Sequence, residues 1–110
     1  MLTIIETPVF QRLARDVWNE EELDAFKVWL AMDPLAGDVI PGAGGLRKVR
    51  WSRAGMGKRG GARVIYYNQI ALGVIALLMV YTKTKFDNLP TEFLVRLKKE
   101  FDDAKSDPKN

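Results

Sequence analysis

Nine basic residues and no acidic ones occupy residues 39–86 of this 110-residue chain. The whole chain has 17 Lys and Arg against 14 Asp and Glu, so the modest net charge of +3 hides an uneven distribution. Because cations without competing carboxylates attract phosphates, a surface built from this segment is suited to bind a nucleic acid. The alternative is a basic face that has no ligand. The nine residues are Arg47, Lys48, Arg50, Arg53, Lys58, Arg59, Arg63, Lys83 and Lys85.

Three of these cations have a spacing that favours chemistry on a phosphate. Lys48 and Arg50 would share one face of a strand, and Arg63 lies in the next strand-like run. A guanidinium donates to two phosphoryl oxygens at once, so Arg63 is the candidate ligand of a reacting phosphate, and Arg50 would share this task. A lysine crowded by other cations releases its proton more readily than a free lysine, so Lys48 is the candidate general base. All three could instead be solvated surface, and Arg63 could form a structural ion pair with Asp38.

The chain contains no Cys and no His. This composition excludes disulfides, Cys-ligated metals and any mechanism that needs an imidazole base, and a metal site would have to be built from carboxylates alone. We expect no cofactor and no metal. The longest apolar stretch, Ile70–Tyr81, is about half the roughly 20 residues of a membrane helix, and no basic-then-apolar signal pattern opens the chain. A cytoplasmic protein without a membrane partner is expected.

The first third of the chain predicts one strand and a helical hairpin. Thr3–Glu6 has the composition of a short strand, and Pro8 then opens a helix with one apolar face. Asn19 is a good N-cap for a second helix, which Pro34 ends. The apolar face of the first helix consists of Phe10, Leu13, Ala14 and Val17, and that of the second consists of Leu23, Phe26, Trp29, Leu30 and Met32.

The rest of the chain predicts a meander of three antiparallel strands and a last helix. A loop over Leu35–Gly45 leads into the sheet, and alternation along the first strand places Val49 and Trp51 against the helices and leaves Lys48 and Arg50 on the free face. The third strand is apolar throughout and should be central. The strands are expected at Leu46–Ser52, Ala62–Asn68 and Val74–Thr82, with a Gly-rich loop at Gly55–Gly61, a turn near Leu72–Gly73 and a helix at Pro90–Lys105.

These elements define a single α+β domain over residues 1–110. We expect a small curved antiparallel β-sheet that is backed by the N-terminal helix hairpin and the C-terminal helix. The helix acids should lie away from the basic surface. Tyr66 and Tyr67 are expected in the core and the sheet rather than as platforms on which bases stack, although alternation puts one of them on the free face.

The chain also resembles a known family. Three segments carry the resemblance: Gly37-Asp38-Val39-Ile40-Pro41-Gly42, Leu46-Arg47-Lys48-Val49-Arg50 and Gly57-Lys58-Arg59-Gly60-Gly61-Ala62-Arg63-Val64-Ile65-Tyr66-Tyr67. In order and spacing they are similar to the HigB branch of the RelE/ParE toxin superfamily. The resemblance implies a RelE-like fold and a ribosome-dependent mRNA endonuclease of a type II toxin-antitoxin system. It also implies a cognate antitoxin with a helix-turn-helix domain.

In such toxins Lys, Arg and sometimes Tyr replace the His pair of other ribonucleases, and a ribose 2′-hydroxyl attacks the adjacent phosphate. The resemblance adds Lys83 to the catalytic candidates, as a general acid or phosphate clamp beside Lys48, Arg50 and Arg63. Many relatives follow this lysine with Arg and place a catalytic Tyr later, whereas Thr84 follows here and no Tyr occurs after Tyr81. The general acid therefore stays open. The expected RNA-binding residues are Arg47, Arg53, Lys58, Arg59, Tyr81 and Lys85.

Two other functions fit the same scaffold. A ParE-like gyrase inhibitor would act by binding and would not need a Lys/Arg cleft, and a non-catalytic module could bind nucleic acid or the ribosome by charge alone. The docking surface of an antitoxin is open as well. It could cover the basic cleft, or it could bind the acidic and apolar segment Glu20–Trp29.

Overall fold

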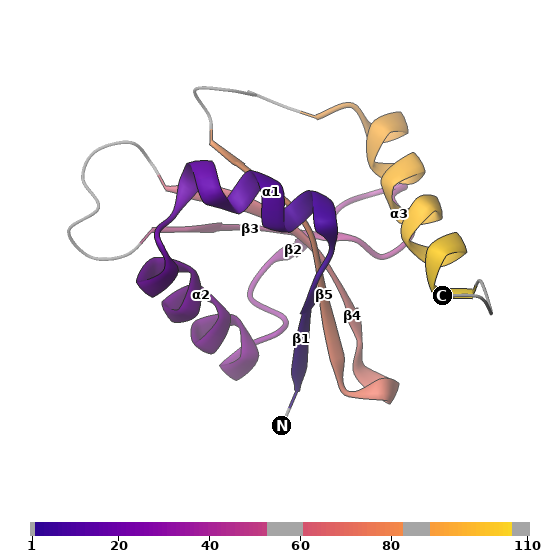
Figure 1. The fold of residues 1–110 in the computed structure, drawn as a ribbon. Helices are drawn as coiled ribbons and strands as arrows, with labels where there is room; N and C mark the ends of the chain where they lie inside the picture. The colour runs from indigo at the N-terminus through magenta and orange to yellow at the C-terminus, as the bar shows by residue number, and fades with distance from the viewer. Residues whose placement is uncertain (1, 53–60, 83–88, 107–110) are drawn as a thin grey trace.

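The computed structural model describes residues 2–52, 61–82 and 89–106 (Figure 1). These residues form an α+β domain with three helices, as the sequence predicts, together with one short 3-10 turn and one five-stranded sheet. The elements are β1 (Thr3–Glu6), α1 (Pro8–Val17), α2 (Glu20–Met32), β2 (Asp38–Val39), β3 (Arg47–Trp51), β4 (Ala62–Gln69), η1 (Ile70–Leu72), β5 (Val74–Thr82) and α3 (Thr91–Ser106).

The sheet has the order β1-β5-β4-β3-β2. The predicted antiparallel meander of three strands is confirmed for β3, β4 and β5. The strand β5 has a neighbour on each side, and every residue from Ile75 to Tyr81 is buried. The expectation of a wholly antiparallel sheet is wrong for β1, which pairs with β5 in parallel. The difference arises from the connection. Short turns join antiparallel neighbours, whereas β1 is followed by two helices, and such a long connection permits parallel pairing.

The loop expected over Leu35–Gly45 contains one short strand. Asp38 and Val39 pair with Lys48 and Arg47 of β3 and extend the sheet by one strand. A two-residue strand leaves no periodic pattern in the sequence, and the surrounding Gly and Pro residues indicate a loop.

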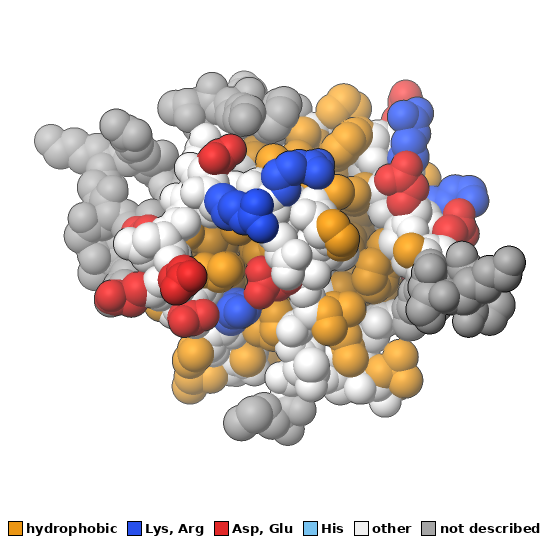
Figure 2. Space-filling model, in the orientation of Figure 1, with side chains coloured by type: hydrophobic (Ala, Val, Ile, Leu, Met, Phe, Trp, Pro, Cys, Tyr) orange, Lys and Arg blue, Asp and Glu red, His pale blue; other side chains and the backbone are white. Residues whose placement is uncertain are grey.

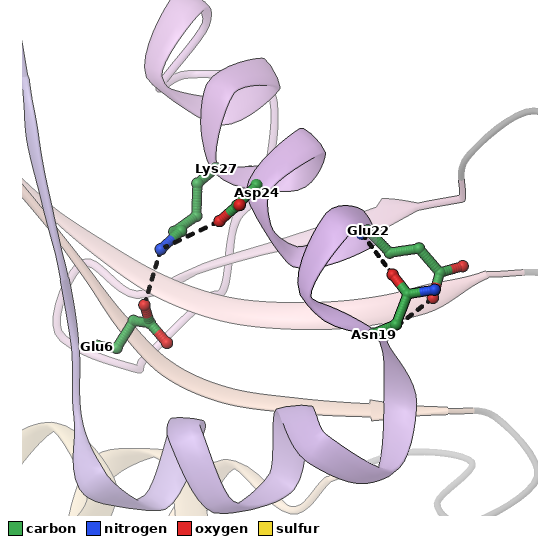
Figure 3. A network of polar contacts seen from close by, with 5 residues as sticks. All are labelled: Glu6, Asn19, Glu22, Asp24 and Lys27. Atoms are coloured by element: carbon green, nitrogen blue, oxygen red, sulfur yellow. Dashed lines mark hydrogen bonds and ion pairs between the residues drawn. The ribbon is translucent and has the colours of Figure 1, made fainter.

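Local capping groups fix the starts of α1 and α2. The Thr7 hydroxyl oxygen accepts from the Phe10 N–H, and the same hydroxyl donates to the Leu77 carbonyl of β5. Asn19 and Glu22 form a reciprocal capping box at the start of α2 (Figure 3). Both helices therefore begin where the sequence predicts, because their start signals are local.

The core consists of two clusters, one on each face of the sheet. The first lies between the hairpin and the sheet and includes Phe10, Trp18, Phe26 and Leu30. The second includes residues of the opposite face of the sheet, such as Ile65, Leu78 and Tyr81, together with Leu94 of α3. In Figure 1, α3 lies apart from the hairpin. Within the described ranges, no helix is long and apolar enough to cross a membrane.

An ion pair joins the hairpin to the first strand. Lys27 Nζ of α2 lies 2.9 Å from Glu6 Oε2 of β1 and 3.9 Å from Asp24 Oδ1 (Figure 3). Because the pair is partly exposed, its contribution to stability is small, about 1 kcal/mol or less. The ion pair connects α2 to β1.

Candidate nucleic-acid interface

The structure brings Lys48, Arg50 and Arg63 together on one face of the sheet. Val49 is buried against the hairpin, so its neighbours Lys48 and Arg50 project from the opposite face, where they are exposed. Arg63 of β4 is the direct cross-strand partner of Arg50. The spacing along β3 and the register between the two strands therefore create a compact group of three cations.

Arg63 lies between two strands that constrain its side chain. On one side its partner is Arg50, and on the other side its partner in β5 is Tyr81. The side chain is half-buried, and its Nη1 atom is buried without a hydrogen-bond partner among the residues described. A buried guanidinium donor without a partner costs free energy.

The charge of this group is not neutralised within the described part of the chain. No ion pair there joins Lys48, Arg50 or Arg63 to a carboxylate. Asp38 is opposite Lys48 in the β2–β3 register, but the structural ion pair considered for Asp38 and Arg63 is not formed. Because like charges directly opposite one another destabilise a sheet, the Arg50–Arg63 pair is costly in the absence of an anion.

Tyr81 is the cross-strand neighbour of Arg63 and is buried in the core. Its side chain is only 2% exposed and belongs to the cluster beneath α3, so its ring is not available for stacking on a base. Burial raises the pKa of the Tyr81 phenol above its ordinary value of 10.0, and the Arg63 charge partly opposes that shift. The phenol is therefore neutral at neutral pH, and the ring limits where Arg63 can lie.

Arg47 does not belong to this group. It is half-buried on the hairpin side of β3, where it is the cross-strand partner of Tyr66. Its Nη1 atom donates to the Gly37 carbonyl at 2.7 Å. The structure thus uses Arg47 to hold the segment between α2 and β2, on the face opposite to Lys48 and Arg50.

Five of the expected site residues lie outside the described residues. They include the candidate Lys83 and both cations of the Gly55–Gly61 loop that were expected to reach RNA. The five are Arg53, Lys58, Arg59, Lys83 and Lys85.

Tyr66 anchors the start of β2. The sequence predicted only that this residue lies in the core. The Tyr66 hydroxyl donates to the Pro34 carbonyl and accepts from the Gly37 N–H, both at 2.8 Å. Asn68 also donates to Pro34, at 2.8 Å. A buried tyrosine needs a partner for its hydroxyl, which was the available signal, but the sequence alone does not identify that partner.

Replacing Tyr66 with Phe is expected to lower the free energy of unfolding by about 1–3 kcal/mol, because the buried Gly37 N–H loses its acceptor. Urea unfolding of the variant and the wild type measures this difference. Tyr67→Phe is the matched control, because Tyr67 lies on the other face and its ring packs against Phe101. Equal stability of Tyr66→Phe and the wild type would contradict the anchoring role.

The two buried tyrosines also predict a loss of stability at high pH. Burial raises the pKa of Tyr66 above its ordinary value of 10.0, more than the Gly37 hydrogen bond lowers it, and the Tyr81 shift has the same direction. The folded protein thus holds these protons more tightly than the unfolded chain, so the contribution to stability is complete below about pH 10 and is lost as the pH rises through the folded values. Melting temperatures from about pH 8 to about pH 11 test this, and Tyr66→Phe should show a weaker dependence.

The described residues hold no group of three or more His, Cys, Asp or Glu side chains that could bind a metal ion. No family model matches the chain.

Proposed function

We propose that this protein is an endoribonuclease of the RelE/HigB type, the toxin of a type II toxin-antitoxin system that cleaves translated mRNA on the ribosome. One observation carries the proposal: Lys48, Arg50 and Arg63 share one face of two paired strands, with no carboxylate bound to any of them in the described residues. A concentration of cations of this kind suits a phosphodiester.

The proposed reaction is attack of a ribose 2′-hydroxyl on the adjacent phosphate. Lys48 would remove the hydroxyl proton, and Arg63 and Arg50 would stabilise the charge that develops on the phosphoryl oxygens. The leaving 5′-oxygen needs a proton, for which Lys83 is the candidate. Because β3 and β4 hold Lys48, Arg50 and Arg63 in a fixed register, the base and the phosphate-stabilising groups need little reorganisation.

The proposed activity defines the partners and the compartment. Translated mRNA and the ribosome are the substrate complex, which places the protein in the cytoplasm. A cognate antitoxin with a helix-turn-helix domain would neutralise it. The exposed cations Lys48 and Arg50 would provide the part of RNA binding that depends on salt.

Primer extension on a reporter mRNA in a cell-free translation system tests the proposal. Cleavage within codons that requires both the protein and ribosomes supports it. An intact mRNA would contradict it, and a gyrase supercoiling assay would then test the ParE-like alternative. Ribosome binding without cleavage would indicate a non-catalytic module.

Arg50→Gln is expected to reduce cleavage about 10- to 100-fold, because one charge-assisted hydrogen bond to the phosphate is lost. The matched control is Arg12→Gln, which removes an equally exposed arginine on α1. The cleavage rate on programmed ribosomes is the measurement. The assignment of Arg50 is wrong if the two variants lose the same amount of activity.

A further inference from the structure

The first strand leaves one edge of the sheet open. β1 is the terminal strand of the sheet, and among the described residues it pairs only with β5. The Thr3 N–H donates to the Gly73 carbonyl and the Thr7 N–H to the Leu77 carbonyl. By the alternation along a strand, the backbone groups of Ile5 also point to β5, whereas those of Ile4 and Glu6 point outward. In Figure 1, no ribbon lies in front of β1 below α1.

Apolar surface lies beside this edge, and Figure 2 shows hydrophobic side chains next to β1. A cavity of about 410 Å³ is lined by Ile5, Leu72, Val74 and Phe101 among others, on the α3 side of the sheet. Ile5 is 40% exposed and Leu72 is 65% exposed. Thr3–Glu6 contains no Lys or Pro, the residues that usually protect an edge strand from pairing.

We propose that a second copy of this chain pairs with β1 in an antiparallel, two-fold symmetric arrangement centred on Ile5. In this register Ile4 of one copy exchanges two hydrogen bonds with Glu6 of the other, and the symmetry repeats the exchange. All the outward N–H and C=O groups of Ile4 and Glu6 are thereby paired. Ile5 lies opposite Ile5 of the second copy, beside the apolar cavity.

Charge and length favour this occupant. The only charged residue of β1 is Glu6, which Lys27 neutralises from the hairpin side (Figure 3). The register sets Glu6 against Ile4, so the two carboxylates do not meet. The edge is short, since the chain turns into α1 at Pro8, and two copies of the same short edge match each other in length.

The resulting dimer leaves the basic face accessible. Lys48, Arg50 and Arg63 lie on β3 and β4, whereas the dimer forms at the opposite end of the sheet order. Opposite residues of an antiparallel pair share a face, so both α3 helices and both basic groups would lie on the same side of one continuous sheet. This inference does not depend on the proposed nuclease activity.

Single cysteines test the register directly, because the chain has none of its own. At the two-fold axis, two copies of Ile5→Cys would have Cα atoms about 4.5 Å apart, which suits a disulfide. Thr3→Cys is the matched control, because it shares the face but lies roughly 13 Å from its symmetry mate. Mild oxidation should cross-link Ile5→Cys into a covalent dimer and leave Thr3→Cys without a cross-link. Equal cross-linking rates, or no covalent dimer of Ile5→Cys, would overturn the register.

Sedimentation equilibrium tests the association without a cross-link. The wild type should dimerise reversibly, and Ile5→Lys should be monomeric, because two lysines would meet at the axis. Val28→Lys, a change at an exposed position on α2, should remain dimeric. Far-UV circular dichroism establishes that each variant is folded. A wild type that is monomeric at every concentration would refute the proposal, and so would an unchanged dimer of folded Ile5→Lys.

Discussion

Arg63→Ala is expected to reduce mRNA cleavage about 10²- to 10³-fold, the effect of removing one preorganised donor to a developing oxyanion. The expectation follows from the position of Arg63 on the central part of the basic face, between Arg50 and Tyr81. Its buried Nη1 atom has no hydrogen-bond partner in the described residues, so Arg63→Ala removes no hydrogen bond of that nitrogen. The rate of cleavage on programmed ribosomes, followed by primer extension, is the measurement.

The same variant should fold normally. Removing the Arg63 side chain relieves its repulsion from Arg50 and breaks no ion pair among the described residues. We therefore expect a melting temperature equal to or above that of the wild type. Arg63→Lys is the second variant: it keeps the charge but loses the two-pronged donor, and it should restore binding more than cleavage. If cleavage and ribosome binding fall equally in Arg63→Ala, Arg63 only binds RNA and the catalytic assignment fails.

Phe26→Ala is expected to lower the free energy of unfolding by about 3–5 kcal/mol, a large part of the stability of a small domain. Phe26 is 0% exposed at the centre of the hairpin cluster. Its ring stacks on Trp18 at 5.0 Å and meets the edge of Trp51 at 5.5 Å. Removing it leaves a cavity between α2 and the sheet that these two large side chains cannot fill without moving. Guanidinium chloride unfolding measures the loss.

Val28→Ala provides the control for Phe26→Ala, because the two residues lie on the same helix. Val28 is 62% exposed, so its truncation should change stability by about 0.5 kcal/mol or less. Because Ala has a higher helix propensity than Phe or Val, a loss of similar size in the two variants would contradict the assignment of the Phe26→Ala loss to packing. A small loss in Phe26→Ala alone would show that the aromatic cluster can close over the cavity.

Several features of the site could be predicted from the sequence because they are local. Alternation along β3 placed Lys48 and Arg50 on the face opposite Val49, and the structure has this arrangement. The same alternation puts Arg47 on the hairpin side, where the structure has it bonded to Gly37, so the strand period argued against grouping Arg47 with the other cations.

The burial of Tyr81 could not be predicted in this way. Tyr81 was expected to bind RNA, but its side chain belongs to the same buried cluster as Leu94 of α3, a residue from a distant part of the chain. The hydroxyl of Tyr66 likewise finds its partners about thirty residues away, at Pro34 and Gly37. No pattern of spacing identifies such partners.

The α+β class, the starts of α1 and α2, the central apolar strand β5 and the faces of β3 follow from local patterns, because capping groups, prolines and side-chain period act over a few neighbouring residues. Three features required the folded chain: β1 joins β5 in parallel, Asp38 and Val39 form a fifth strand, and Arg63 lies between Arg50 and Tyr81. These features depend on register between segments far apart in the chain, and register is set by how the whole core packs.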